Sequence, residues 1–301
     1  MKVLVTGSTG FVGVHLVDHL AAEGDEVIVT SRSSGGPDVC DLSALTAFVG
    51  DHQPDTVFHL AGQADVEVSW CNPLESFRTN GEGTYNLLAA ARMAGVERVV
   101  TVTSADIYGF ALPDDLPLGE SAPLRPVSPY GASKAVADLV ALQAHLGFGQ
   151  EVIRARSFNH FGPGQSDRAV CAALASRIVA SEVAGATTIP VGDMSVRRDF
   201  TDVRDVVRAY RLLAERGRPG LAYNVCSGQS VSIRHVADRL IALSGDSVRM
   251  EPKKELFRPA DLPELRGDPT LIRNHTDWTP LIDLESTLTD VLKDWRSRSS
   301  D

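Results

Sequence analysis

Short apolar runs alternate with longer amphipathic stretches through the first half of the chain, and this alternation predicts the fold. The runs are nearly continuous in Val, Ile, Leu and Thr, which is typical of parallel strands buried on both faces. The stretches between them have helical periodicity, so the alternation indicates βαβ units and a doubly wound α/β sheet. The predicted strands are Lys2–Thr6, Glu26–Thr30, Thr56–Leu60, Arg98–Thr103 and Glu151–Ala155, and the predicted helices are Phe11–Glu23, Leu42–His52, Thr84–Ala94 and Tyr130–Leu146.

The second half of the chain is less regular and is richer in Pro and Arg. No sharp linker, repeat or low-complexity tract separates it from the first half. We interpret it as a smaller substrate-binding lobe on the carboxyl edge of the sheet. The expected division assigns residues 1–155, with returning segments near 190–230, to the sheet domain and residues 156–301 mainly to the lobe.

Composition and charge exclude several classes of protein. The 301 residues are 43% hydrophobic and 23% charged, close to globular averages. A formal net charge of −10 argues against a nucleic-acid binder, which usually has a basic face. No apolar run approaches the roughly 20 residues that cross a membrane, and the four cysteines lack the spacing of a zinc site or a disulfide framework. We expect a cytoplasmic protein with reduced thiols and no metal site.

A glycine-rich turn joins the first predicted strand to the first predicted helix. Its sequence, TGSTGFVG, has the spacing G-x-x-G-x-x-G. Between a strand and a helix, such glycines permit a tight turn, close approach of a pyrophosphate and close packing of the helix on the sheet. The helix N-terminus then offers free N–H groups to the phosphates. The expected dinucleotide contacts in this turn are Gly7, Thr9, Gly10, Phe11, Val12 and Gly13.

The end of the second predicted strand indicates which dinucleotide is favoured. An NAD site usually has an acidic residue there to accept from the ribose 2′-hydroxyl. This chain has Thr30-Ser31-Arg32-Ser33 instead. Arg32 and the serine hydroxyls could hold a 2′-phosphate, so NADP(H) is favoured over NAD(H), with a solvated Arg32 as the alternative. Further expected cofactor contacts are Asp41, Leu42, Leu60, Ala61 and Gly62.

Ser104, Tyr130 and Lys134 form a candidate catalytic set. Tyr130 and Lys134 are four residues apart in a predicted helix and therefore share one helix face. A nearby ammonium favours the phenolate, so we expect the pKa of Tyr130 to be lowered. Ser104 follows the fourth predicted strand, where active groups of open α/β sheets gather. A Tyr-x-x-x-Lys pair is common by chance, but its order after the glycine turn and Ser104 favours catalysis.

These motifs resemble the extended short-chain dehydrogenase/reductases of the nucleotide-sugar epimerase/dehydratase type, over nearly the whole chain. From Arg156 onward, the chain is most similar to the GDP-4-keto-6-deoxy-mannose reductases, which form GDP-rhamnose. Besides the glycine turn, the matching strings are HLAG (59–62), RTNGEGT (78–84), TSADIYG (103–109), SPYGASK (128–134), RSFNHFGPGQ (156–165), RRDFTDVRDV (197–206), YNVCSG (223–228) and RPADLP (258–263).

The resemblance implies a Rossmann-type fold and a role for each matching residue. Ser104, Tyr130 and Lys134 would be the catalytic triad, and Tyr130 and Lys134 would also contact the cofactor. Asn80 would support the cofactor site. The predicted helices Thr84–Ala94 and Tyr130–Leu146 resemble a pair that forms a four-helix dimer interface in this family, so we expect a homodimer.

The resemblance also implies a nucleotide-diphosphate sugar as substrate, with GDP-linked sugars favoured. Arg198 and Arg258 would hold the diphosphate, because Arg forms bidentate, charge-assisted hydrogen bonds with phosphate oxygens. A structural ion pair is the alternative for each arginine. The other expected substrate contacts are Ser104, Asp106, Arg156, Asn159 and His160.

Asp106 leaves the type of reaction open. Family dehydratases use an acid at this position to remove a proton from sugar C5, but related reductases carry one as well, and a carboxylate can simply cap a turn. The favoured reaction is NAD(P)H-dependent reduction of the C4 keto group of a 4-keto-6-deoxy sugar, GDP-4-keto-6-deoxy-D-mannose to GDP-D-rhamnose. The alternatives are a GDP-mannose 4,6-dehydratase, another sugar-nucleotide 4-epimerase or reductase, and a non-catalytic dinucleotide sensor, which the intact triad disfavours.

Overall fold

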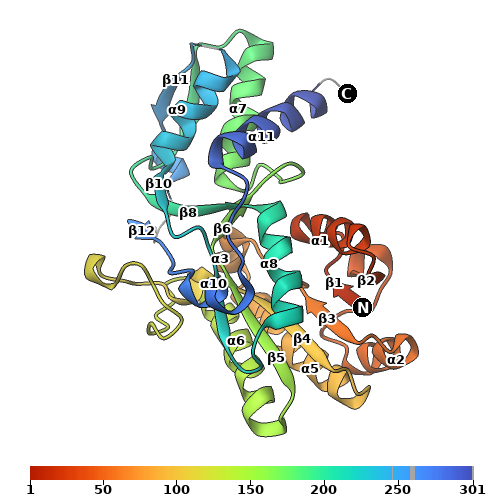
Figure 1. The fold of residues 1–301 in the computed structure, drawn as a ribbon. Helices are drawn as coiled ribbons and strands as arrows, with labels where there is room; N and C mark the ends of the chain where they lie inside the picture. Colours follow the sequence, from red (N-terminus) through yellow and green to blue (C-terminus); the bar gives the residue numbers. More distant parts are fainter. Residues whose placement is uncertain (246, 258–261, 300–301) are drawn as a thin grey trace.

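The computed structural model describes residues 1–245, 247–257 and 262–299. Its larger part is a six-stranded sheet in the order β2-β1-β3-β4-β5-β9, with every neighbouring pair parallel (Figure 1). The chain changes direction along the sheet between β1 and β3, which confirms the predicted doubly wound fold. The strands are β1 (Lys2–Thr6), β2 (Glu26–Thr30), β3 (Thr56–His59), β4 (Arg98–Ser104), β5 (Glu151–Ser157) and β9 (Ala222–Val225).

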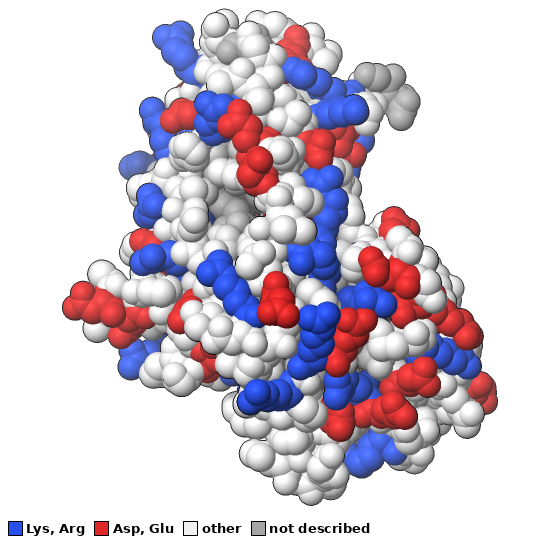
Figure 2. Space-filling model, in the orientation of Figure 1, with Lys and Arg blue, Asp and Glu red and all other residues white. Residues whose placement is uncertain are grey.

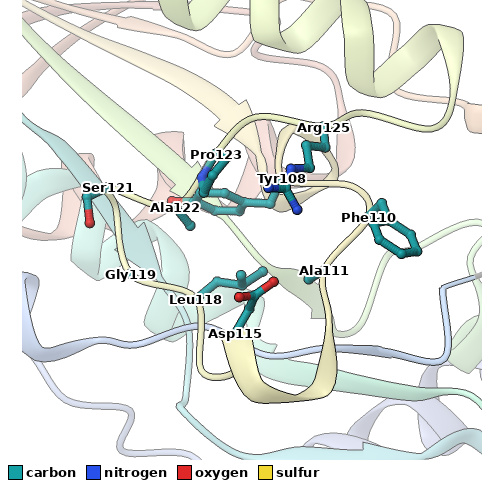
Figure 3. A pocket seen from close by; sticks show the side chains of 10 residues that line it. All are labelled: Tyr108, Phe110, Ala111, Asp115, Leu118, Gly119, Ser121, Ala122, Pro123 and Arg125. Carbon is teal, nitrogen blue, oxygen red and sulfur yellow. The ribbon is translucent and has the colours of Figure 1, made fainter.

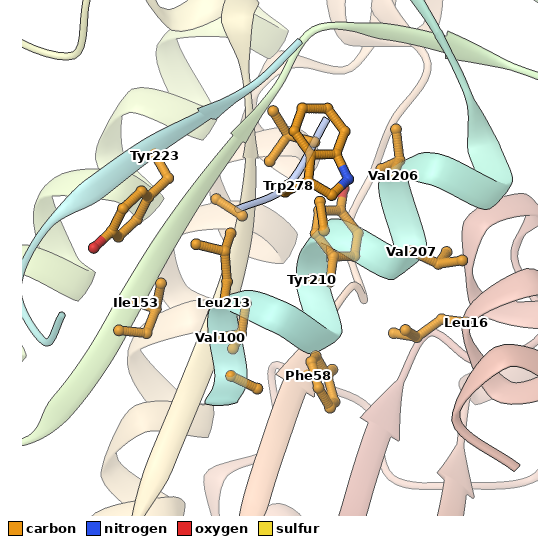
Figure 4. Close-up of a cluster of buried hydrophobic side chains, with 14 of the residues drawn as sticks. Leu16, Phe58, Val100, Ile153, Val206, Val207, Tyr210, Leu213, Tyr223 and Trp278 are labelled. Atoms are coloured by element: carbon orange, nitrogen blue, oxygen red, sulfur yellow. The ribbon is translucent and has the colours of Figure 1, made fainter. Parts of the chain in front are cut away.

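Helices cover both faces of this sheet, so its strands are apolar on both sides. In the core on one face, shown in Figure 4, the buried side chains include Phe58, Tyr210 and Trp278. The helices on this face are α1 (Phe11–Ala22), α8 (Val203–Arg216) and α10 (Thr270–Thr276). Those on the opposite face are α2 (Leu42–His52), α5 (Gly83–Met93) and α6 (Pro129–Phe148).

The smaller part begins where the chain leaves the carboxyl end of β5. It has a sheet with β8 at its centre, a second sheet of two strands, and helices that enclose a separate apolar core. The chain then returns to the large sheet at α8 and β9. The elements of this lobe are β6 (Asn159–Phe161), α7 (Val170–Ala184), β7 (Thr188–Val191), β8 (Arg197–Asp202), β10 (Ser230–Ser232), α9 (Ile233–Ser244), β11 (Arg249–Pro252), β12 (Glu264–Leu265) and α11 (Leu284–Arg298).

Several short helical segments connect these elements. Between β3 and α5, one of them is a turn of π-helix that carries Asn80, and such turns are frequent at functional sites. The segments are η1 (Arg32–Ser34), α3 (Val66–Cys71), α4 (Pro73–Phe77), the π-helical η2 (Arg78–Glu82), η3 (Ala105–Ile107), η4 (Pro113–Asp115) and η5 (Lys254–Leu256).

Charged side chains of both signs are interspersed over the face of the molecule shown in Figure 2. Many surface charges are paired, for example Arg211 with Glu215 and Arg296 with Glu182, each at 2.6 Å. Much of the surface charge is therefore compensated locally. Within the described ranges, no helix combines the length and the apolar character needed to cross a membrane.

A buried charge cluster joins α6 to β5. The Asp138 carboxylate accepts hydrogen bonds from Arg154 Nη1 at 2.5 Å, from Arg156 Nη2 at 2.7 Å and from Arg156 Nε at 3.0 Å. The side chain of Asp138 is fully buried, and those of the two arginines are 9% and 5% exposed. Removing the carboxylate would leave two buried guanidinium groups without their counter-ion.

We therefore expect Asp138→Asn to lower the free energy of unfolding by about 3–5 kcal/mol. Glu151→Gln is the control, because it breaks a pair with Arg98 at 2.6 Å in which Glu151 is 49% exposed. A pair of that kind contributes about 1 kcal/mol or less. Urea denaturation followed by circular dichroism measures both losses. Small and equal losses would contradict the role of Asp138 as a buried counter-ion.

Candidate active site

The backbone of the glycine turn fits a bound pyrophosphate. Gly7 has φ +71°, in the left-handed region that favours glycine. A Cβ at Gly7 would lie 2.7 Å from the Ala61 nitrogen, and a Cβ at Gly13 would lie 2.2 Å from the Gly7 oxygen. Gly10, the residue before α1, has no side chain to cap the first N–H groups of that helix. These groups are therefore available to an anion.

Hydroxyl groups gather beside this turn, at the end of β2. Ser31 Oγ lies 3.0 Å from Thr9 Oγ1 and 3.1 Å from Ser33 Oγ, and Thr9 Oγ1 lies 2.7 Å from Ser33 Oγ. The side chain of Arg32 is 78% exposed and lies 3.7 Å from Asp38. Hydroxyls and an exposed guanidinium together form a surface that suits a phosphate.

The other predicted cofactor residues lie in two places. Leu60 and Ala61 follow β3, and the Ala61 N–H donates to Thr6 Oγ1 at 3.2 Å. Asp41 caps α2, because its Oδ1 accepts from the Ala44 N–H at 2.9 Å, and Leu42 is the first residue of that helix. The structure therefore shows a local role for Asp41, and its contact with the cofactor stays a prediction.

Ser104, Tyr130 and Lys134 lie at the carboxyl end of β4. Ser104 is the last residue of this strand, and Tyr130 and Lys134 lie one helical turn apart in α6. The side chains of Ser104 and Tyr130 share a hydrogen bond, and the Asp106 carboxylate is close enough to act on the same phenol. Lys134 Nζ donates to the Val102 carbonyl at 3.1 Å. The structure thus brings a hydroxyl, a phenol and an amine together at one strand end.

Burial dominates the titration of this set. It raises the pKa of Tyr130 above its ordinary value; the Asp106 carboxylate raises it further, and the hydrogen bond with Ser104 opposes the rise. Burial also lowers the pKa of Lys134 to about 8. The expected lowering of the pKa of Tyr130 is therefore wrong for this structure, because desolvation of the phenolate and the nearby Asp106 carboxylate outweigh the hydrogen bond with Ser104.

Asn80 holds the loop after β3 against α6. Its amide group donates to Ser133 Oγ at 2.8 Å and to the Gln63 carbonyl at 3.0 Å, and its Oδ1 accepts from the Gln63 N–H at 2.8 Å. A Cβ at Gly62 would lie 2.7 Å from Asn80 Oδ1 and 3.2 Å from Lys134 Nζ. Glycine at position 62 therefore lets the loop pass close to the amine.

Ser69, which the sequence analysis did not single out, contacts the backbone of the candidate tyrosine. Ser69 Oγ, on α3, accepts a hydrogen bond from the Tyr130 N–H at 3.1 Å and donates to the Val66 carbonyl at 2.6 Å. Its side chain is fully buried. A single serine within a helical stretch gives no sequence signal for a partner 61 residues away.

Two predicted substrate residues, Asn159 and His160, lie on β6 just beyond the carboxyl end of β5. The His160 ring stacks on Phe11, with ring centroids 6.3 Å apart. Its Nδ1 lies 2.9 Å from the Phe158 carbonyl, so Nδ1 carries the proton and Nε2 is an acceptor. Burial lowers the pKa of His160, which favours this neutral form. The lobe thus places the His160 imidazole against Phe11, the first residue of α1.

Arg156, by contrast, belongs to the scaffold. Besides Asp138, its guanidinium binds the Tyr108 hydroxyl at 3.0 Å and the Glu120 carbonyl at 2.8 Å, and its side chain is 5% exposed. We therefore assign Arg156 a structural role in place of the expected substrate contact, because its donors are used within the protein. The sequence could not reveal this, since the partners come from three other segments.

The structure describes one of the two arginines that were predicted to bind the diphosphate. Arg198 lies on β8, and its Nη1 donates to the carbonyl groups of Arg197 and Leu262, both at 2.8 Å. Arg258 lies outside the described residues. Among the residues that are described, no cluster of three His, Cys, Asp or Glu side chains could hold a metal ion.

A pocket of about 340 Å³ lies in the loop between β4 and α6 (Figure 3). Tyr108, Phe110, Asp115, Leu118 and Arg125 are among the side chains that line it. None of its lining residues belongs to the predicted cofactor or substrate contacts. We therefore do not include it in the candidate site.

Comparisons with known proteins agree on one family. The model of the NAD-dependent epimerase/dehydratase family matches residues 3–226. The GDP-6-deoxy-D-mannose reductase of Pseudomonas aeruginosa is 35% identical over 99% of this chain and 98% of its own length. A UDP-glucose 4-epimerase of Mycolicibacterium smegmatis is 30% identical over 99% of this chain and 100% of its own. The solved structure of RMD from Pseudomonas aeruginosa complexed with NADPH has a TM-score of 0.89 and 35% identity, over 99% of this chain and 100% of that one. The chain therefore belongs to the NAD-dependent epimerase/dehydratase family and is an NAD(P)-dependent oxidoreductase.

Proposed function

We propose that this protein reduces the C4 keto group of a nucleotide-linked 4-keto-6-deoxy sugar. The proposed substrate is GDP-4-keto-6-deoxy-D-mannose, and the product is GDP-D-rhamnose. The observation that carries the proposal is the set of Ser104 with the buried Tyr130 and Lys134 at the end of β4. This set occurs in a chain that is 35% identical, over nearly its whole length, to a GDP-6-deoxy-D-mannose reductase.

Each of the three side chains would have its own role in the protonation of the sugar O4. Tyr130 is protonated at neutral pH, so its hydroxyl can donate the proton that O4 needs; because burial raises its pKa, this donation depends on stabilisation of the phenolate by the groups around it. Ser104 hydrogen-bonds the same phenol and holds O4 beside it. With a pKa of about 8, Lys134 is mainly protonated at pH 7 and stabilises the phenolate that remains. The nicotinamide, when bound, supplies the hydride to C4 and leaves oxidised.

We propose NADP(H) as the preferred dinucleotide, with NAD(H) as the alternative. Two observations support this preference: residues 30–34 include no carboxylate, and Ser31, Ser33, Thr9 and Arg32 offer donors instead. A family member of known structure is complexed with NADPH. The N–H groups at the start of α1 would bind the pyrophosphate, and Asn80 and Gly62 would shape the passage beside Lys134.

The lobe would hold the sugar nucleotide. Asn159 and the Nε2 acceptor of His160 would face the sugar, and Arg198 would bind the diphosphate. We also propose a homodimer formed through α5 and α6. Large side chains with apolar surface are exposed on these two helices, including Tyr85, Met93 and Leu139, and burying apolar surface of this kind is what drives most association.

A 4,6-dehydratase is the second candidate, because Asp106 supplies the carboxylate that such a reaction needs. This carboxylate lies close enough to Tyr130 to raise its pKa, so it belongs to the neighbourhood of the proposed catalytic set, where it would act as the base for the C5 proton. A dehydratase would convert GDP-mannose to its 4-keto-6-deoxy derivative and would regenerate its cofactor in every cycle. Net consumption of the cofactor therefore distinguishes the two reactions.

Replacing the proposed proton donor tests the mechanism. Tyr130→Phe is expected to lower kcat by about 10²- to 10⁴-fold, the usual contribution of a general acid. The Kd for NADPH should change little. The measurement is absorbance of the reduced nicotinamide, with the product of a GDP-mannose dehydratase as substrate. Tyr85→Phe, on α5, is the control: it removes a hydroxyl away from Ser104 and Lys134, keeps the apolar ring that the proposed dimer would bury, and should retain full activity. A Tyr130→Phe enzyme with normal kcat would remove Tyr130 as the donor.

Replacing Arg32 tests the preference for NADPH. Arg32→Ala should raise the KM for NADPH roughly 10- to 100-fold, because a hydrogen bond to a charged group contributes about 1.5–3 kcal/mol. The KM for NADH should stay the same. Arg234→Ala is a matched control, since Arg234 is also exposed and lies 3.5 Å from its acidic partner Asp238. If both KM values rise together in Arg32→Ala, Arg32 does not bind a 2′-phosphate.

A further inference from the structure

We propose that Ser69 is a positioning residue that holds Tyr130 in place for proton transfer. This inference rests on the proposed role of Tyr130 as the proton donor. Tyr130 is the second residue of α6, where a backbone N–H has no acceptor within the helix. The Ser69 hydroxyl supplies that acceptor at 3.1 Å.

The hydroxyl of Ser69 is oriented by a second contact. The hydroxyl donates a hydrogen bond to the Val66 carbonyl at 2.6 Å, and this directs a lone pair of Oγ toward the Tyr130 N–H. Ser69 is fully buried, and α3 packs against α6. A buried N–H that lost this acceptor would have no water to replace it.

The helix that carries Ser69 is itself fixed at its start. Asp65 Oδ1 caps α3 by accepting from the Val68 N–H at 3.1 Å, and its other oxygen pairs with Arg168, in the loop before α7. Gln63 Nε2 donates to the Asp65 carbonyl at 2.7 Å. The short helix α3 is therefore held at one end by groups from both parts of the molecule, and Ser69 lies near its other end, against α6.

Three serines fix the backbone around Tyr130, and Ser69 is the one that lies outside α6 and its cap. Ser128 Oγ accepts from the Gly131 N–H at 3.0 Å, and Ser133 Oγ donates to the Tyr130 carbonyl at 2.8 Å. Those two contacts move with α6, whereas Ser69 ties the tyrosine to another helix. A displacement of about 1 Å at a reacting group can lower a rate about 10²-fold, so the loss of this tie should appear in kcat.

The kinetic test compares two buried serines on neighbouring helices. Ser69→Ala is expected to lower kcat about 10-fold while leaving the KM values for NADPH and for the sugar nucleotide nearly unchanged. Ser76→Ala is the matched control: Ser76 is also fully buried, but its Oγ donates to the Asn72 carbonyl at 3.4 Å. Both variants lose a buried hydroxyl, so a fall in kcat confined to Ser69→Ala cannot come from lowered stability alone.

Hydrogen exchange supplies a readout that does not depend on turnover. The amide of Tyr130 should exchange faster in Ser69→Ala than in the unmodified protein or in Ser76→Ala, measured by NMR on the full chain. If Ser69→Ala does not fold, Ser69→Cys keeps a weak acceptor of similar size and should have an intermediate effect on exchange and on kcat.

The outcomes separate this inference from the proposed function. Unchanged exchange at Tyr130 in the Ser69 variant would overturn the contact, and faster exchange with normal kcat would overturn its role in positioning. Either result, together with an inactive Tyr130→Phe enzyme, defeats only the role of Ser69. An active Tyr130→Phe enzyme defeats the role of Tyr130 as the proton donor, on which this inference rests, whatever the exchange shows. Failure of the unmodified protein to reduce the 4-keto sugar defeats the proposed function.

Discussion

Burial of the Tyr130 phenol is the constraint on which the rest of the candidate site depends. Away from water, the phenolate is costly, so the group keeps its proton, and donating that proton requires the site to stabilise the phenolate. The same burial lowers the pKa of Lys134 to about 8, so the amine keeps most of its charge at pH 7 and can lose it at slightly higher pH. The site thus holds a proton donor and a cation side by side, and both are tuned chiefly by the exclusion of water.

Such a donor is useful only when its position is fixed, and the fold fixes it from several directions. The carboxyl end of β4 places Ser104 against the phenol, and Asn80 ties the loop after β3 to Ser133 in α6. Asp138 holds the middle of the same helix to β5 through two buried arginines. In our account, Ser69 completes this arrangement, because it ties the first turn of α6 to a helix outside it.

Features that depend on local pattern were predictable from the sequence. The helix Leu42–His52 has the predicted bounds, and the strand–turn–helix at Gly7 follows from residues adjacent in the chain. The structure also brings Ser104, Tyr130 and Lys134 together, while their catalytic roles stay predictions.

Features that depend on distant segments were not predictable in the same way. The direction of the pKa shift of Tyr130 depends on how completely water is excluded, which no spacing reveals. Arg156 stands in a motif typical of substrate binding, yet its partner Asp138 comes from a separate helix. Ser69 gave no signal at all, because its partner is a backbone N–H, which every residue except proline carries.

The most direct test of the central claim is the stoichiometry of cofactor and sugar in a single reaction. The purified protein would be mixed with NADPH and GDP-4-keto-6-deoxy-D-mannose, and both the nicotinamide absorbance and the sugar product would be followed. Our account predicts that one NADPH is oxidised for each deoxyhexose formed. No oxidation of NADPH or NADH with this substrate, together with formation of a 4-keto sugar from GDP-mannose without net use of cofactor, would contradict it.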